Sequence, residues 1–227
     1  MSERLADGRV LSVNLARVRS NLWGKAGVTG IDKRPATGPV LVRAPGEKAH
    51  GLGSGLAGDT IGDLANHGGD DQAVYAYARE DLDRWQRQLG RELPAGSFGE
   101  NLTTTGLDVS AAVVGERWQI GDEVELQVTC PRIPCSTFRG WIDARGWLRT
   151  FTVAALPGAY LRVVGAGHVR HRDPISVLHR PDHQITVATV FRALTLEPAL
   201  LPGILAADQL PGETKEMAAQ GRTFSLG

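Results

Sequence analysis

The spacing of apolar residues changes once along the chain. Up to Val177, short apolar runs alternate with polar residues and turn signals, which is typical of β-strands. Beyond Thr186, apolar residues recur every three to four positions, as on one face of a helix. We therefore predict a β-rich domain over residues 1–180 and a compact appendage of about three helices over residues 181–227, joined near Pro181.

Strand signals dominate the first domain. The clearest is a hairpin in which Arg117–Ile120 is followed by a Gly-Asp turn and the alternating run EVELQVT, so that one face is buried. Shorter apolar runs predict five further strands, at Arg9–Asn14, Pro39–Val42, Ala73–Tyr77, Tyr160–Val164 and Pro174–Val177.

Helix signals mark a few segments. After the AVYAY strand, four apolar residues recur at steps of four, three and four, and Gly90 supplies a stop. These four form the buried face: Ala78, Leu82, Trp85 and Leu89. In the tail, one helical face consists of Val187, Val190, Phe191 and Leu194. Two prolines, Pro198 and Pro211, are placed to open two further short helices.

The composition of three segments predicts that they form loops. Residues 24–39 are rich in Gly, Lys and Arg, and Ser97–Gly106 reads as irregular. Residues 51–71 are dense in Gly and Asp. Because glycine tolerates positive φ and close backbone approach, this last segment is either a mobile surface loop or part of a ligand site.

Composition excludes several classes of function. The 227 residues carry 25 cationic and 25 acidic side chains, so no basic excess indicates nucleic-acid binding. No apolar run is long enough to span a membrane, and the N-terminus lacks the apolar core of a signal peptide. We expect a cytoplasmic protein that binds neither nucleic acid nor a membrane.

Cys135 is the strongest candidate for chemistry. It lies just beyond the hairpin strand, on a loop that Pro131 and Pro134 stiffen, and the nearby Arg132 favours its thiolate. A thiolate is a soft ligand for transition metals, although a buried structural role is equally open from the residues alone. Cys130, at the end of the alternating strand, fits a structural role.

Other candidates are polar residues in the loops. His67 precedes a Gly-Gly pair that lets a ligand approach, although a solvated histidine is an equally simple interpretation. Lys33 and Arg34 form a basic pair that, with Arg132, could neutralise a phosphate, or they are solvated loop residues. Asn101 offers the donors and acceptors that a polar heterocycle requires, or it forms a turn with its neighbour Glu100.

Acidic residues of the Gly-rich segment do not form a recognisable metal loop. Their spacing is too scattered for the EF-hand pattern, and phosphate-loop, nucleophile-elbow and zinc-protease motifs are also missing from the sequence. The acidic residues concerned are Asp59, Asp63, Asp70 and Asp71.

Taken together, five segments resemble the MOSC family, named for the C-terminal domain of molybdenum-cofactor sulfurases, and its YiiM-type subgroup in particular. They occur in family order over most of the chain: TGIDKRP (29–35), GDTIGDLANHGGDDQAVYAY (58–77), FGENLT (98–103), IGD (120–122) and PRIPC (131–135). The tail resembles the small three-helix domain that follows MOSC in this subgroup. The resemblance implies a mostly β, barrel-like fold with a few helices, α+β overall.

The resemblance also implies a molybdopterin-type cofactor whose metal is bound by Cys135. The residues implied to line the pterin and phosphate site are Lys33, Arg34, His67, Asn101 and Arg132, with His67 and Cys135 as the catalytic pair. The implied activity is reduction of N-hydroxylated compounds such as hydroxylamino-purines, amidoximes and hydroxamates. Since the sequence contains no flavin or nicotinamide motif, a separate reductase has to supply electrons; a homodimer is possible.

Two alternatives stay open, and two departures from the family bear on substrate preference. The chain could be a non-enzymatic carrier of molybdenum cofactor or sulfur, or a plain redox or metal-binding thiol protein. After Cys135 it has Ser136-Thr137-Phe138 where relatives often have a basic residue, and before Ile175 it has Arg-Asp-Pro where relatives often have Gly-Asp.

Overall fold

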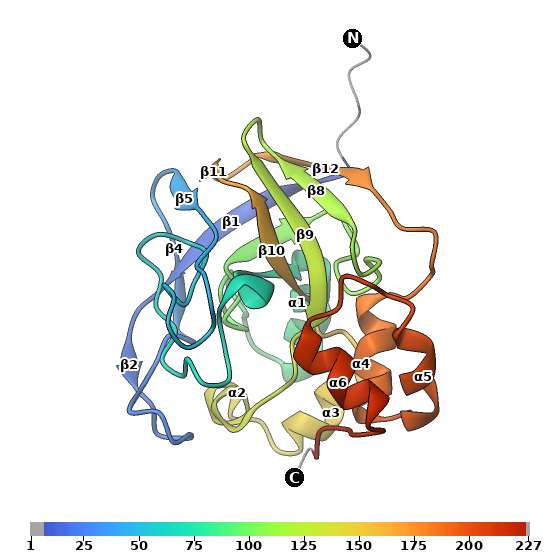
Figure 1. Ribbon diagram of the computed structural model, residues 1–227. Helices are drawn as coiled ribbons and strands as arrows, with labels where there is room; N and C mark the ends of the chain where they lie inside the picture. The colour runs from blue at the N-terminus through green and yellow to red at the C-terminus, as the bar shows by residue number, and fades with distance from the viewer. Residues whose placement is uncertain (1–6, 226–227) are drawn as a thin grey trace.

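The computed structural model describes residues 7–225, and its centre is a closed β-barrel (Figure 1). Around the barrel the strands follow the order β12 (Pro174–His179), β8 (Arg117–Ile120), β9 (Val124–Pro131), β10 (Ala159–Gly165), β6 (Val74–Ala78), β7 (Leu102–Thr105) and β1 (Gly8–Ala16). Pairing of β12 with β1 closes the ring. Only β6 and β7 run parallel; the other neighbours among these strands are antiparallel.

Five shorter strands extend this framework. β4 (Lys33–Pro35) pairs with the far end of β1, from Asn14 to Ala16. Two separate ribbons pair β2 (Arg19–Ser20) with β3 (Val28–Thr29), and β5 (Val40–Val42) with β11 (Gly167–Val169). The predicted fold class, a mostly β barrel with a few helices, is confirmed.

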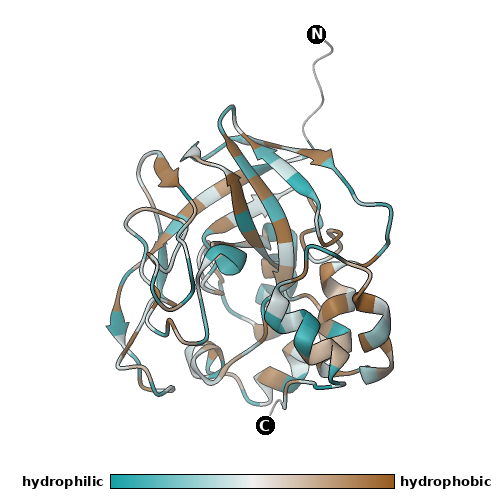
Figure 2. Ribbon diagram, in the orientation of Figure 1, coloured by the Kyte–Doolittle hydropathy of each residue, from teal (hydrophilic) through white to brown (hydrophobic). Residues whose placement is uncertain are grey.

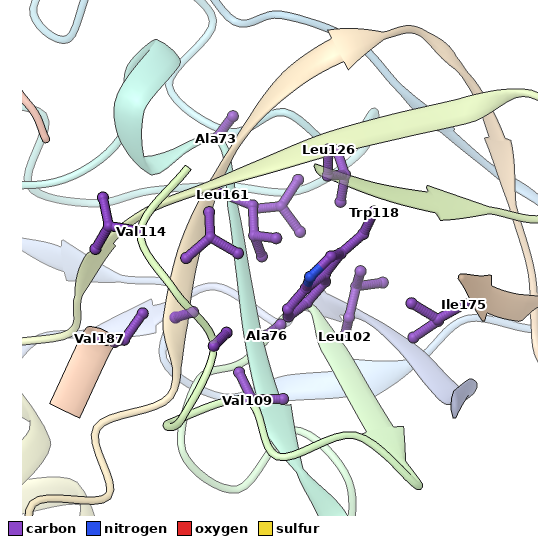
Figure 3. Close-up of a cluster of buried hydrophobic side chains, with 14 of the residues drawn as sticks. Ala73, Ala76, Leu102, Val109, Val114, Trp118, Leu126, Leu161, Ile175 and Val187 are labelled. Carbon is purple, nitrogen blue, oxygen red and sulfur yellow. The ribbon is translucent and has the colours of Figure 1, made fainter. Parts of the chain in front are cut away.

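Alternation along the strands fills the barrel interior. In β9, Val124, Leu126 and Val128 are fully buried, whereas the polar residues between them are partly exposed. The alternation is visible in the colouring of β9 in Figure 2. Trp118 from β8 and Leu126 from β9 point inward toward side chains of the facing strands (Figure 3). The indole nitrogen of Trp118 donates to Glu116 over 3.0 Å, so its polar atom is satisfied in the core.

Three helices cover one end of the barrel around an aromatic cluster: α1 (Arg79–Leu89), α2 (Ser136–Ile142) and α3 (Trp147–Ala154). Helix α1 is the predicted one, and Gly90 ends it in the left-handed conformation at φ 65°. Five rings pack with centroid separations of 5.0–6.5 Å, those of Trp85, Phe98, Phe138, Trp147 and Phe151. These contacts fix α2, the helix that follows Cys135.

The tail consists of short helices that pack on the barrel: α4 (Val187–Thr195), the 3₁₀ turn η2 (Pro198–Leu200), α5 (Leu201–Ile204) and α6 (Gly212–Ala219). The four apolar residues of the predicted face of α4 are buried, and Pro198 and Pro211 stand at the starts of η2 and α6 as expected. The Val187 amide donates to the Ala112 carbonyl over 2.9 Å, and Val190 joins the barrel core. The division at residue 180 stays a prediction.

Two predicted loops contain strands instead. Within Ser97–Gly106 lies β7, a barrel strand whose sequence is LTTT. Thr103 and Thr104 are buried, and Thr103 donates to Glu100 over 2.8 Å, so polar residues occupy positions where the sequence pattern requires apolar ones. Residues 24–39 contain β3, which pairs with β2, and β4, which pairs with β1. Both pairings are made by backbone hydrogen bonds, which the pattern of apolar and polar side chains does not reveal.

Two helices, α2 and α3, were also missing from the prediction. Each has only about two turns and presents two buried apolar residues one turn apart, so the periodic signal is too short to identify. The five strands predicted outside the hairpin correspond to β1, β5, β6, β10 and β12. Their ends and those of the hairpin strands agree with the structure to within two residues. A further short 3₁₀ turn, η1 (Asp70–Gln72), precedes β6. Within residues 7–225, no helix is long and apolar enough to cross a membrane.

Candidate functional site

Cys135 occupies the position where β9 gives way to α2. Strand β9 continues to Pro131, and an extended turn brings the chain to Cys135, which is the N-cap residue of α2 (φ −117°, ψ 173°). Its side chain is half-buried. The sulfur is thus held between a barrel strand and a helix packed by aromatic residues, which is the rigid support that a ligating side chain requires.

Two side chains influence the ionisation of this thiol: His67, which is distant in sequence, and Arg132, which is on the preceding turn. Burial opposes its ionisation, but a hydrogen bond with His67, the charge of the Arg132 guanidinium and the Phe138 backbone amide outweigh that effect and lower the pKa of Cys135 to about 6. The structure therefore brings together three of the predicted site residues: Cys135, His67 and Arg132.

Arg132 is the most enclosed cation beside the thiol. It is 6% exposed, and its guanidinium lies 3.6 Å from the centroid of the Phe138 ring and 6.0 Å from that of Tyr75. Burial raises the pKa of the nearby Tyr160 hydroxyl to about 12, and the charge of Arg132 opposes this effect. The Nη1 atom of Arg132 is buried and has no hydrogen-bond partner among residues 7–225. An unpaired charged donor is costly in a protein interior, so this atom is available to an acceptor that is not part of the chain.

Cys130 lies in a different environment. It is part of β9, opposite Tyr160 in β10, and is 5% exposed. Burial raises the pKa of its thiol to about 12, so the sulfur stays protonated at neutral pH. The environments of the two cysteines thus favour opposite protonation states.

The loop that carries His67 is positioned by its glycines. A Cβ atom on Gly68 would lie 2.7 Å from the Gly53 carbonyl oxygen, and one on Gly69 would lie 2.7 Å from the Lys48 Cα. Both glycines have positive φ. The Gly-Gly pair therefore permits close packing of chain on chain, and not the ligand approach that we expected from the sequence.

Lys33 and Asn101 meet through Asp59. The Lys33 ammonium lies 2.5 Å from one Asp59 carboxylate oxygen, and the Asn101 side-chain amide donates to the other over 2.9 Å. Ser54 donates to the same carboxylate over 2.7 Å. Burial lowers the pKa of Lys33, and the attraction of Asp59 opposes this effect. None of the contacts described for Lys33 or Asn101 reaches Cys135.

Arg34 points away from this network. Its side chain is 54% exposed and pairs with the buried Asp32 over 2.8 Å, and Arg19 pairs with the other oxygen of that carboxylate over 2.5 Å. Two surface hollows, of about 700 and 260 Å³, both border Arg34. The smaller also borders Lys33 and the end of α2 opposite Cys135; the thiol itself lines neither hollow.

Sequence reasoning missed several residues that shape the site. Asp59 was set aside because the acidic residues lack metal-loop spacing, yet it accepts hydrogen bonds from three side chains. Phe138 and Tyr160 enclose Arg132, but each looks like an ordinary core residue in the sequence. Within the described part of the chain, no group of three or more His, Cys, Asp or Glu side chains is arranged to hold a metal ion.

Comparison with known proteins identifies the chain's relatives. The family model described as the MOSC domain matches residues 63–176, a range that includes His67, Asn101, Arg132 and Cys135 but begins after Lys33 and Arg34. YflK of Bacillus subtilis, an uncharacterized protein, is 33% identical over 179 residues, which cover 78% of this chain and 76% of YflK.

A second relative is much longer than this chain. A protein named Reductase from Gibberella moniliformis is 28% identical over 207 residues, which are 90% of this chain but only 35% of the Gibberella protein. Among solved structures, YiiM from Geobacillus stearothermophilus matches with a TM-score of 0.75 and 24% identity, over 94% of this chain and 98% of that one. At this identity the match shows a shared fold.

Proposed function

The chain belongs to the MOSC domain family, and on that premise we propose that it is a molybdenum-cofactor-dependent reductase of N-hydroxylated compounds with Cys135 as the metal ligand. The observation that carries the proposal is the half-buried Cys135 thiol, held at the start of α2 beside His67 and Arg132, with a pKa of about 6. Such a thiol is ionised at neutral pH, as a soft metal ligand has to be.

The residues around Cys135 fit a pterin-type cofactor. Arg132 offers a buried donor, Nη1, that has no partner in the described chain, and an anionic or carbonyl oxygen of a ligand would satisfy it. His67 adds a ring nitrogen beside the sulfur. When bound, a molybdenum–pterin cofactor supplies the capacity to take up two electrons and pass them to a substrate.

The proposed reaction is the conversion of R–NHOH, two electrons and two protons into R–NH₂ and water. The N–O bond breaks, nitrogen is reduced, and the oxygen leaves as water. We assign His67 to proton delivery, because its imidazole lies next to Cys135 and histidine exchanges protons near neutral pH. Reduction of this kind would detoxify N-hydroxylated bases.

The roles of Lys33, Arg34 and Asn101 in binding the cofactor stay predictions. Phosphate would have to compete with Asp59 for Lys33 and with Asp32 for Arg34. Asn101 also uses its side-chain oxygen to accept from the Tyr75 amide over 3.1 Å. For these reasons we propose Arg132 as the principal polar contact of the cofactor.

Electrons have to come from another protein or domain in this scheme. The Gibberella relative is named a reductase, and about two thirds of its length lies outside the match.

The test is to express the protein in a host that makes molybdenum cofactor and to measure bound metal, released pterin and activity on the same preparation. The proposal predicts one molybdenum and one pterin per chain, and reduction of an amidoxime or a hydroxylamino-purine by a chemical electron donor. Cofactor without turnover would favour a carrier of molybdenum cofactor. Absence of both metal and pterin would favour a plain thiol protein.

A further inference from the structure

A short hairpin is fastened to α2 next to Cys135. It consists of β2, β3 and the residues between them, and it lies beside α2 in Figure 1. The Asn21 side-chain amide donates to the Thr137 hydroxyl over 3.2 Å. The Trp23 ring meets the Trp141 ring edge-on at 6.5 Å and covers Gly140, where an added Cβ would lie 2.2 Å from it. Thr137 is two residues from Cys135, so the hairpin is anchored beside the proposed metal ligand.

The hairpin exposes apolar side chains that its own strands cannot bury. Leu22 is 79% exposed, Val28 is 44% exposed, and even Trp23 is 38% exposed despite its contact with α2. Val18, immediately before β2, is also exposed. Single exposed apolar residues are common, but a group of four that includes a tryptophan is typical of the centre of a protein interface.

Positive charge surrounds this apolar group. Residues 17–29 contain three cations and no acidic residue, and residues 136–154, which form α2 and α3, contain three arginines and one aspartate. Lys25 follows Gly24, whose Cβ position is 3.0 Å from the Thr137 hydroxyl, and Arg139 precedes Gly140. Both side chains are exposed, and neither has an acidic partner among residues 7–225. The chain as a whole is neutral, so these two segments are more basic than the rest of the sequence, although Arg19 is paired with the buried Asp32.

We propose that the apolar hairpin and its basic surroundings are the docking surface for an acidic one-electron carrier protein that delivers electrons to the site at Cys135. This inference rests on the proposed function, which requires two electrons from outside the chain. An apolar centre with a cationic rim suits a partner of opposite charge, because charge complementarity steers encounter and apolar burial holds the complex. A membrane could also accept basic and apolar residues, but attachment of the hairpin to the helix that follows Cys135 favours an electron donor.

The experiment measures binding of two acidic probes, a [2Fe–2S] ferredoxin and a flavodoxin, to the holoprotein at low and physiological salt. A double variant, Lys25→Glu with Arg139→Glu, should weaken binding at least about tenfold, since like-charge repulsion replaces attraction. Leu22→Ser should weaken it about fivefold. Arg9→Glu is the control: it reverses the charge of one exposed arginine at the opposite end of β1, which is half of the charge change in the double variant, and should leave binding unchanged.

Turnover with reduced methyl viologen separates failure of this inference from failure of the proposed function. We expect all three variants to keep full activity with this small donor and circular dichroism like the parent, while the double variant and Leu22→Ser lose activity with the protein donor. If neither probe binds, or if Arg9→Glu weakens binding as much as the double variant, the docking surface is wrong even when viologen-driven turnover is intact. Hairpin-dependent binding to phosphatidylserine vesicles without binding to either probe would overturn it in favour of a membrane. If viologen drives no turnover in the parent, the proposed function fails, whatever the binding result.

Discussion

His67 is the strongest single influence that lowers the pKa of the Cys135 thiol, although the two residues come from separate segments of the barrel domain. His67 arrives on the Gly-rich loop before β6, and Cys135 stands at the end of the turn after β9. This contact joins two of the motifs that carry the family resemblance, and it accounts for a large part of the depressed pKa of Cys135. The pH dependence of the thiol's reactivity therefore reports whether His67 and Arg132 lie beside Cys135.

The two cysteines should differ in their alkylation by iodoacetamide. In protein purified from a host that makes no molybdopterin, the rate at Cys135 should rise with pH through a midpoint near 6 and then level off, because the thiolate is the nucleophile. Cys130 should stay unreactive up to pH 9, since it is buried and its pKa is about 12. Peptide mass spectrometry across pH 4–10 checks both. A midpoint near 9 at Cys135 would contradict the arrangement.

Removal of the imidazole should shift that midpoint upward. His67→Ala deletes the hydrogen bond and charge that lower the pKa of Cys135, while burial continues to raise it. We expect an increase of about one pH unit or more, which corresponds to roughly 1.4 kcal/mol of lost thiolate stabilisation. Asn66→Ala is the control, because Asn66 is exposed and donates only to Asp63 on the same loop. An equal shift in the two variants would indicate a general disturbance of the loop.

Much of the fold could be predicted because the barrel strands bury one face and expose the other. The β8–β9 hairpin shows this best, since Val124, Leu126 and Val128 alternate with polar residues. Strand β7 could not be predicted in this way, because both Thr103 and Thr104 are buried and the hydroxyl of Thr103 is satisfied by a residue three positions earlier.

The site was predictable in part for a similar reason. Cys135 and Arg132 lie close together in the sequence, so their pairing follows from local geometry. The partner of Lys33 does not: Asp59 is distant in sequence, and only tertiary packing brings the two together. The presence of glycine at position 68 also could not show whether its backbone packs against another segment of the chain or against a ligand; the structure places it against Gly53.

The Lys33–Asp59 ion pair should be important for stability. The side chains of Lys33 and Asp59 are 6% and 1% exposed, so Asp59→Asn leaves a buried ammonium without its counter-charge and should lower the free energy of unfolding by about 3–5 kcal/mol. Lys33→Met combined with Asp59→Asn removes both charges and should recover part of that loss. Urea unfolding of the parent, both single variants and the double variant measures the coupling. Additive effects of the two substitutions would show that the pair is not coupled.

Gly140 should be essential for seating the β2–β3 hairpin on α2. Its Cβ position lies 2.2 Å from the Trp23 ring, so Gly140→Ala must displace that ring from α2, and we expect this to loosen the hairpin while leaving the barrel intact. We expect trypsin cleavage at Lys25 to accelerate several-fold, because a released hairpin opens more often. Gly203→Ala is the matched control, since nothing lies within 4 Å of its Cβ position in α5. Unchanged cleavage in Gly140→Ala would mean that the hairpin is not held by this contact.

The assignment of the metal ligand to Cys135 is the central claim, and a comparison of two serine variants tests it most directly. Cys135→Ser replaces the soft sulfur by oxygen with little change in volume, and Cys130→Ser makes the same change in the wall of the barrel. The measurement is reduction of a model amidoxime by reduced methyl viologen, normalised to bound pterin. Cys135→Ser should lose activity by at least about a thousandfold, and Cys130→Ser should keep most of it at a stability cost of about 0.5–3 kcal/mol. Turnover by Cys135→Ser at the parent rate, or loss of turnover in Cys130→Ser instead, would contradict the assignment.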